Sequence, residues 1–174
     1  RAQSAVNAGL AAADSTLYGH APYQKIIPWL KKAMETTGLN EININNYIER
    51  FIINGKVLIP GFFRPIVIED ERVVFLRTLA KERGMQKGAY ELFSEYVEKY
   101  IQIDCGYNIN AGGYAAAVLL DNGLSCEQVV TLNSVLVTPG IIGCYIDALN
   151  HDETPLLPLR CGDVIYEGPE NRCL

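Results

Sequence analysis

The chain of 174 residues is long enough for one domain with a hydrophobic core, and 49% of its residues are hydrophobic. Its formal net charge of −5 and the lack of any basic run longer than Lys31-Lys32 argue against nucleic-acid binding, which needs clustered Lys and Arg. The longest apolar stretches, such as 114–120, are shorter than the roughly 20 residues that cross a bilayer, so the sequence predicts a soluble chain without a membrane span.

The first part of the chain predicts three helices. Residues 2–13 form an alanine-rich segment whose small side chains favour close packing. A second helix covers 22–37 with a proline in its first turn, and Gly38 ends it. Asn40 can cap the third helix, which ends near the Asn-Gly pair at 54–55.

The connection at residues 56–72 reads Lys-Val-Leu-Ile-Pro-Gly-Phe-Phe-Arg-Pro-Ile-Val-Ile-Glu-Asp-Glu-Arg. It is apolar, whereas an exposed connection between helices gains nothing from large apolar side chains. Its Pro60-Gly61 pair indicates a turn, and the Glu-Asp-Glu run at 69–71 places acid at the start of the next helix, where the helix dipole favours it. A buried connection of this kind usually lines a site.

The second half of the chain predicts four more helices, at residues 73–83, 90–101, 108–120 and 126–149. Ser125 caps the last of them, and Pro139-Gly140 interrupts it. Beyond His151 three prolines predict an extended tail. No segment sustains the period-two alternation of a strand, so the predicted fold class is all-α.

The five cysteines are odd in number and widely spaced, and only His20 and His151 could join them as metal ligands. No Cys-x-x-Cys pair occurs, although structural zinc sites draw on such paired ligands. We therefore expect no metal site. Reduced, mostly buried thiols are expected instead, and they fit a mitochondrial matrix or cytoplasm.

Four short motifs follow one another in a fixed order along the chain. They are Leu-Tyr-Gly-His-Ala at 17–21, Pro-Gly-Phe-Phe-Arg at 60–64 with Asp-Glu-Arg at 70–72, Asn-Ile-Asn at 108–110, and Tyr-Glu-Gly-Pro-Glu-Asn-Arg at 166–172. The set resembles the citrate synthase family, in which the motifs read Leu-His-Gly-Gly-Ala, Pro-Gly-Phe-Gly-His running to Asp-Pro-Arg, Asn-Val-Asp, and Tyr-Val-Gly-Pro-Glu-Pro-Arg.

This resemblance implies a citrate synthase-like all-α fold that comprises the small domain and part of the large domain. Residues 1–21 would be the end of the large-domain helices, 22–137 the small domain, and 138–174 the return helix and C-terminal tail. The N-terminal half of the large domain would be absent. The resemblance therefore implies a homo- or hetero-oligomer that includes a chain supplying this half.

The family joins an acyl-CoA to a 2-oxo acid, and its relatives cleave citryl-CoA. In this chemistry a carboxylate removes a proton, one histidine stabilises the enol, and a second histidine polarises the acceptor carbonyl. By motif position the first histidine falls on Tyr18, with His20 two residues on, the second histidine falls on Arg64, and the aspartate falls on Asn110. Asp104 is a nearby alternative carboxylate.

Binding residues are carried over from the same motifs. Arg72 and Arg160 match arginines that hold substrate carboxylates, whereas on their own they read as a helix-surface charge and a tail residue. Pro60, Gly61 and Phe62 match the loop that borders coenzyme A, so coenzyme A or acetyl-CoA is the implied ligand. With Arg64 beside Arg72, we expect weak binding of a carboxylate or CoA.

Asn110 separates two hypotheses about function. A carboxamide cannot accept a proton at neutral pH, and a positioned base is worth about 10²- to 10⁴-fold in rate. The sequence therefore favours a degenerate, non-catalytic subunit that binds a CoA thioester or an organic acid, or that only supports an assembly. The alternative is an active CoA-thioester condensing or citryl-CoA-cleaving enzyme whose site is completed by another chain. Tyr18 and His20 could equally be a packing tyrosine and a loop or capping histidine.

Overall fold

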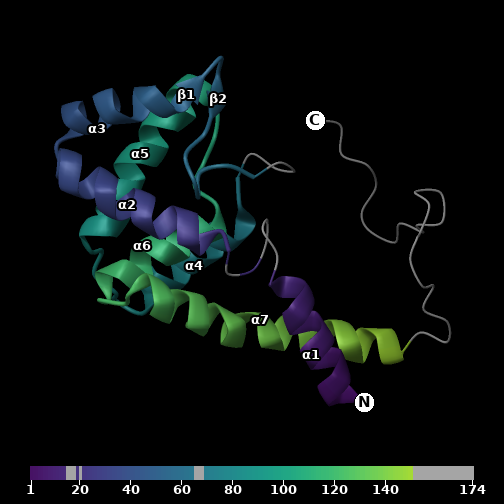
Figure 1. Ribbon diagram of the computed structural model, residues 1–174. Coiled ribbons are helices and arrows are strands. Elements are labelled where there is room, and N and C mark those ends of the chain that lie inside the picture. The colour runs from purple at the N-terminus through teal and green to yellow at the C-terminus, as the bar shows by residue number, and fades with distance from the viewer. Residues whose placement is uncertain (15–18, 20, 65–68, 151–174) are drawn as a thin grey trace.

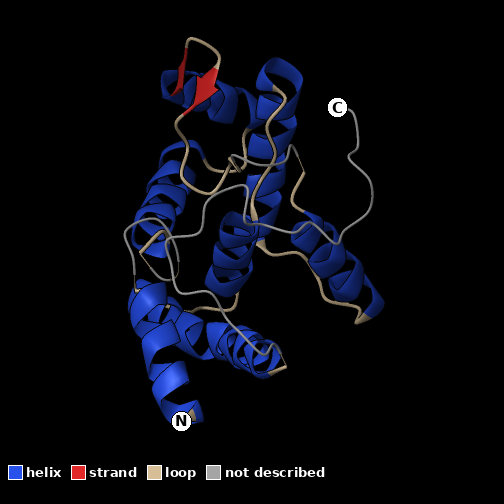
Figure 2. Cartoon of the chain, turned by 90° about the vertical axis from the view of Figure 1, so that its right-hand side faces the viewer, coloured by secondary structure: helices blue, strands red, loops and turns tan. Residues whose placement is uncertain are grey.

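The computed structural model describes residues 1–14, 19, 21–64 and 69–150 (Figure 1). Helices dominate these residues, which confirms the predicted all-α class (Figure 2). In chain order the elements are α1 Ala2–Ala13, α2 Tyr23–Thr37, α3 Glu41–Ile48, the 3₁₀ turn η1 Glu49–Phe51, β1 Ile52–Ile53, β2 Lys56–Val57, α4 Glu71–Glu82, α5 Ala89–Cys105, α6 Ala111–Asp121 and α7 Cys126–Leu149.

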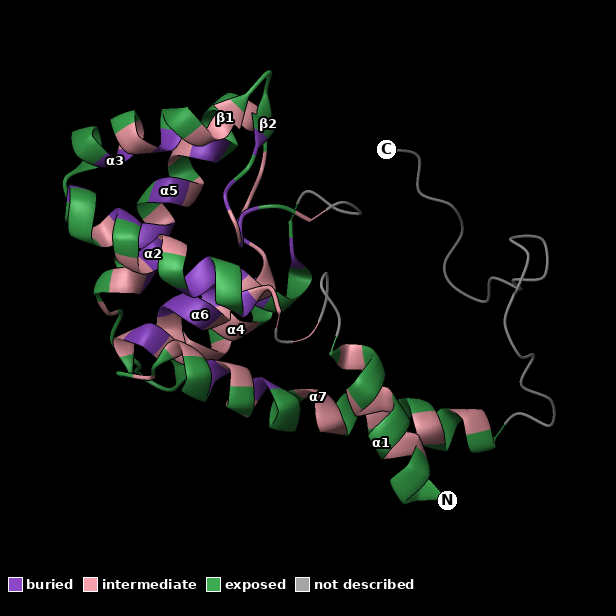
Figure 3. Cartoon of the chain, viewed as in Figure 1, coloured by how far each residue is buried: buried purple, intermediate pink, exposed green. Residues whose placement is uncertain are grey.

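The core lies between α2, α3, α5 and α6, and its centre is aromatic (Figure 3). The ring of Trp29 on α2 lies 5.8 Å from that of Phe51, 6.0 Å from that of Phe62 and 6.2 Å from that of Phe93. Phe62 and Phe93 are fully buried. The apolar connection predicted to be buried therefore supplies one of the central core residues, and this fixes the loop that carries the sequence motif.

Side-chain caps explain where several helices begin. Asn40 and Ser125 accept hydrogen bonds from backbone amides in the first turns of α3 and α7, as the sequence predicted. The side chain of Gln128 in turn accepts a hydrogen bond from the backbone N–H of Ser125, which completes a capping box. Asp70 and Asn110 cap α4 and α6 in the same way, and both of these caps lie in the motifs described above.

The segment 52–57 departs from the prediction of a helix that ends near the Asn-Gly pair. Asn54 and Gly55 both have positive φ angles, 50° and 73°, and they connect the antiparallel strands β1 and β2. Two-residue hairpin turns of this handedness prefer Asn-Gly. The pair therefore builds a small hairpin, because both of its residues tolerate the left-handed conformation.

α7 continues through Pro139-Gly140, so the predicted interruption is wrong. Over its 24 residues α7 is long and apolar enough to cross a bilayer, by length and composition alone. The prediction that no stretch reaches this length was wrong, because it considered short apolar runs such as 114–120, whereas α7 is apolar on average over a longer span. The expectation of mostly buried thiols was also wrong for the described cysteines, since Cys105 and Cys126 are half-buried and Cys144 is exposed.

α1 packs against the second half of α7, and together they extend beyond the core (Figure 1). A Cβ atom at Gly9 would collide with the side chain of Ile141, so the two helix backbones approach closely at this point. No residue of α1 is buried, and on α7 only Val129 and Asn133 are. We call α1 and residues 135–149 of α7 the α1–α7 arm.

Candidate functional site

The motif loop at 60–64 lies directly against the amino end of α6. Gly61 adopts a φ of +89°, and a Cβ atom there would lie 2.9 Å from the Cα of Gly113. A Cβ atom on Gly113 would in turn collide with the carbonyl oxygen of Gly61. The glycines at these two positions therefore allow the two backbones to touch.

Asn110 joins this loop to α6 through three polar contacts. Its backbone N–H donates to the carbonyl oxygen of Gly61 at 2.9 Å, and its Nδ2 donates to the carbonyl oxygen of Phe63 at 2.8 Å. Its Oδ1 accepts from the backbone N–H of Gly113 at 3.0 Å and so caps α6. Both ends of the carboxamide are therefore engaged in holding the loop and the helix together.

The identity of this residue follows from those contacts. An aspartate at position 110 could keep the cap, but its second carboxylate oxygen would face the carbonyl oxygen of Phe63 with no proton between two acceptors. Only the amide offers a donor on one side and an acceptor on the other. The residue that the resemblance places at the base position is thus suited to a structural contact that a carboxylate would disrupt.

Asp70 is the polar centre of the site, although its position in the sequence indicated only an acid at the start of a helix and the first residue of the Asp-Glu-Arg motif. Its side chain is 1% exposed. Nε and Nη2 of Arg72 donate to its two oxygens at 2.8 Å each, and Nη1 of Arg64 lies 3.3 Å from Oδ1. The backbone N–H of Ala111 donates to Oδ2 at 2.9 Å, so the carboxylate lies at the amino end of α6 as well as capping α4.

Both arginines of the predicted anion site therefore have internal partners. Arg64 donates to the exposed carboxylate of Glu71 at 2.6 Å in addition to its contact with Asp70. Two guanidinium groups face two carboxylates, so the cluster offers no surplus positive charge to a ligand.

The environment of Asp70 lowers its pKa to about 2, first through the hydrogen bonds from Arg72 and then through the backbone N–H of Ala111, while burial acts in the opposite direction. A carboxyl whose pKa is lower in the folded chain than in the unfolded chain stabilises the fold above the unfolded pKa of about 4, and this is lost as the pH falls towards 2. The natural chain should therefore have a higher free energy of unfolding than Asp70→Asn at pH 6. We expect this difference, the stability gap, to decrease by about 2 kcal/mol when the pH is lowered to 2.5.

Urea unfolding at both pH values measures this gap. Glu69→Gln is the matched control, because it makes the same acid-to-amide change at the exposed neighbouring residue. A gap at Asp70 that is independent of pH would contradict the ionised state assigned to this carboxylate.

Phe62 and Phe63 have opposite environments although they are adjacent. Phe62 is fully buried, so of this residue only the backbone is available to the coenzyme A contact that the resemblance implies. Phe63 is 43% exposed and packs edge-on against Tyr107 with the ring centroids 5.1 Å apart. This pair fastens the loop to the α5–α6 connection at a further point.

A second polar network joins α4, α5 and α6 next to the site. The carboxylate of Glu98 on α5 accepts from the backbone N–H of Ile109 at 3.0 Å and from Nη2 of Arg77 on α4 at 2.6 Å. The guanidinium of Arg77 lies 5.5 Å from the ring centroid of Tyr114 on α6. Burial raises the pKa of Tyr114 to about 12, and its hydroxyl donates to Glu91. These contacts tie three helices together beside the motif Asn-Ile-Asn.

The structure thus brings together part of the predicted site. Arg64, Arg72, Asn110 and Gly61 gather at the amino end of α6. Tyr18, His20 and Arg160 lie outside the described residues. Asp104 is exposed near the end of α5. Burial raises the pKa of the nearby Tyr100 to about 12, with smaller contributions from Glu49 and Asp104.

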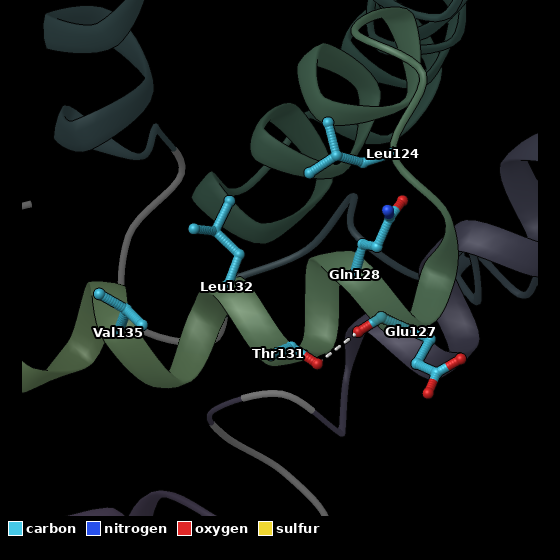
Figure 4. Close-up of a pocket in the computed structure, with 6 residues that line it drawn as sticks. All are labelled: Leu124, Glu127, Gln128, Thr131, Leu132 and Val135. Atoms are coloured by element: carbon cyan, nitrogen blue, oxygen red, sulfur yellow. Dashed lines mark hydrogen bonds between the residues drawn. The ribbon is translucent and has the colours of Figure 1, made fainter.

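Two surface hollows formed by described residues lie away from this cluster. One is a shallow apolar groove along the first half of α7, where Gln128 and Leu132 rise towards Leu124 (Figure 4). The other lies within the α1–α7 arm, between Ala5 and Tyr145. Among the described residues no three His, Cys, Asp or Glu side chains gather into a group that could hold a metal ion.

Comparison with known proteins assigns the class of fold. No family model matches the chain, and no curated protein sequence matches it significantly. Its fold is all-α and citrate synthase-like. The structure is similar to that of citryl-CoA lyase from Hydrogenobacter thermophilus, with a TM-score of 0.65 and 21% sequence identity over 97% of this chain and 66% of that chain. At this identity the likeness concerns the fold, and the chain spans about two thirds of the length of the lyase chain.

Proposed function

We propose that this chain is a citrate synthase-like subunit that does not condense acyl-CoA with a 2-oxo acid on its own, and that serves as a binding or structural part of an assembly. The observation that carries this proposal is the state of Asn110. Its carboxamide caps α6 and holds the carbonyl oxygen of Phe63, so it has neither the basicity nor the freedom to remove a substrate proton.

The arginines support the same proposal. In this chemistry, arginines hold the carboxylates of the acceptor, but Arg72 makes a paired contact with Asp70, and Arg64 contacts Asp70 and Glu71. Binding of an organic acid or a CoA thioester is therefore expected to be weak. It would require one of these internal ion pairs to open.

One observation favours the alternative of an active enzyme completed by another chain. The similar lyase chain extends beyond the matched region, since only 66% of it is covered. Residues supplied from such a region could add a base in place of the carboxamide of Asn110. Asp104 does not fill this role in the described structure, because it lies beside Tyr100 rather than in the Asp70–Asn110 cluster.

We expect the purified chain to release no free thiol from acetyl-CoA with oxaloacetate, and to show no cleavage of citryl-CoA. Without a positioned base, the rate of proton removal is expected to fall by about 10²- to 10⁴-fold. A coupled thiol-release assay checks the condensation, and turnover near the usual enzyme median of about 10 s⁻¹ would refute the proposal. Activity that appears only when a second chain is added would support the alternative instead.

A further inference from the structure

One side of α7 carries a regular apolar stripe that neither the core nor α1 covers. Asn133 of α7 is buried towards the core and Ile141 contacts α1 at Gly9, and both lie on other sides of the helix. The stripe follows steps of three and four residues in alternation. We call it the α7 seam, and its members are Leu132, Val135, Pro139, Ile142, Ile146 and Leu149.

The spacing of the α7 seam is that of a helix that pairs with another helix. Alternating steps of three and four residues average 3.5, which keeps the apolar side chains in line along a partner helix. With Gln128, one step earlier, the pattern covers about three heptads, the length from which it predicts pairing. Its four large aliphatic members from Val135 to Leu149 are 41% to 65% exposed, so the side chains needed for pairing are free.

The two halves of the α7 seam have complementary shapes. The first half forms the shallow apolar groove of about 480 Å³, in which Leu132 and Val135 line the side next to Leu124 (Figure 4). The second half presents Ile142, Ile146 and Leu149, which are large and exposed. A hollow and a set of protruding side chains on one helix can fit each other only across two copies.

The positions of the α7 seam define how the two copies would align. Counted from Pro139, Val135 and Ile142 lie four and three residues away, and Leu132 and Ile146 lie seven residues away on either side. An antiparallel copy centred on Pro139 therefore places Ile142 against Val135 and Ile146 against Leu132. This is a two-fold contact in which each patch meets its own counterpart, and antiparallel helix dipoles favour it.

The distribution of charge favours a second copy over a bilayer. Residues 128–146 carry no charged side chain, so two copies of a chain with a net charge of −5 can approach along α7 with little repulsion. Helices that cross membranes are usually flanked by Lys or Arg. No Lys or Arg occurs between residues 100 and 159, and the charged residues nearest to the seam are Glu127 and Asp147.

The length of α7 is sufficient for a specific contact. Its 24 residues extend over about 36 Å, and a helix with its side chains is about 11 Å across. A contact along half of its circumference covers about 600 Å² of each copy. Specific protein interfaces begin near a total of about 1,200 Å², so the seam and groove together reach that size.

We propose that the α7 seam is a homodimer contact, in which α7 of a second copy packs antiparallel and places Ile146 and Leu149 in the groove beside Leu124. The proposal rests on the proposed function only in requiring an assembly. It adds the partner, the helix and the register of the contact.

The first test changes the seam without touching the core. Ile142→Gln places an amide in the middle of the seam, and Ser134→Gln introduces the same side chain at an exposed position of α7 outside it. We expect Ile142→Gln to weaken dimer association at least about tenfold in sedimentation equilibrium, because each copy would bury an unpaired amide. Ser134→Gln should leave association unchanged, and circular dichroism should show both variants folded.

The second test reports the register by disulfide cross-linking. Val135→Cys and Ile142→Cys are made as separate chains with Cys144→Ser, because Cys144 is exposed. After subunit exchange and mild oxidation, we expect a link between positions 135 and 142 in the mixture and none in either chain alone. In the antiparallel pair each position is offset from its own counterpart by about 10 Å, beyond the reach of about 7 Å for a disulfide.

The outcomes separate this inference from the proposed function. Links within each chain alone would overturn the antiparallel arrangement, and no link in any sample would overturn the seam as the contact. A dimer that Ile142→Gln does not weaken would also overturn the seam, but it would leave the assembly standing. If the natural chain is a monomer, both the seam and the self-assembly fail, whereas the thiol-release assay still decides the catalytic part of the proposed function.

Discussion

Replacing Phe62 with alanine is expected to lower the free energy of unfolding by about 3–5 kcal/mol, a large part of the 5–15 kcal/mol that stabilises a typical domain. The ring is fully buried and lies 6.0 Å from that of Trp29, which also contacts Phe51 and Phe93. Removing it leaves a cavity where four elements meet, and the flanking loop lies against Gly113, so the surroundings cannot easily collapse.

Phe63→Ala is the matched control because it makes the same change one residue along. Phe63 is 43% exposed and packs edge-on against Tyr107, so its loss should cost about 0.5–1.5 kcal/mol. Equilibrium unfolding in urea, monitored through Trp29, measures both variants. Equal losses at the two positions would show that the buried position of Phe62 does not govern the stability of the loop.

The helices and their starting residues could be predicted because those signals are local. Asn40 and Ser125 cap helices as expected, and Gly38 ends α2 with a positive φ of 60°. A cap depends on a side chain and the amide groups two or three residues later, and all of these are visible in the sequence. The burial of Phe62 also followed from the apolar character of a connection that would otherwise be polar.

Two elements could not be predicted from the same rules. An Asn-Gly pair such as 54–55 is found both at the ends of helices and in hairpin turns. The strands on either side of it are two residues long, too short to show the apolar–polar alternation that would have indicated a hairpin. Pro139 was predicted to interrupt the helix because proline lacks a backbone N–H donor and disfavours the helical conformation of the residue before it. The helix nevertheless continues through it, in a region where α1 packs alongside.

The site was predicted in its residues but not in its connections. The motifs located Arg64, Arg72 and Asn110, yet nothing in their spacing shows that Asp70 accepts from both arginines and from the amino end of α6. The acidic run around Asp70 suggested only a favourable interaction with a helix dipole. The contact to Ala111 spans 41 residues of sequence, and pairings of such length depend on how helices pack, which local patterns do not specify.

The α1–α7 arm is an apolar surface that the described residues leave largely exposed (Figure 3). Residues 2–13 carry no charge, and Asp147 is the one charged residue between 132 and 149. The large apolar side chains on α7 that remain exposed are Val135 at 65%, Leu136 at 57%, Ile142 at 41%, Ile146 at 53% and Leu149 at 65%. Soluble monomers rarely expose contiguous apolar patches above a few hundred Å².

We therefore expect the purified chain to form an obligate complex, with a second copy, with a different chain, or with both. Burying a large aliphatic side chain gains about 1.5–3 kcal/mol, so a few of those on the arm supply enough driving force for a stable interface. Sedimentation equilibrium measures the mass directly. A stable, folded monomer near 19.3 kDa would contradict this expectation.

Two variants and a control locate the interface in that complex. Leu136→Glu and Ile146→Glu each place a charge on the arm and should lower the assembled mass towards the monomer, because an unpaired charge is costly to bury. Ile103→Glu is the control, since Ile103 is 75% exposed on α5, away from the arm, and its substitution should leave the mass unchanged. Flotation with lipid vesicles tests whether a lipid bilayer, rather than a protein chain, covers the arm. Co-flotation that Ile146→Glu abolishes would mean that α7 meets a bilayer instead of a protein chain, which its length and composition allow.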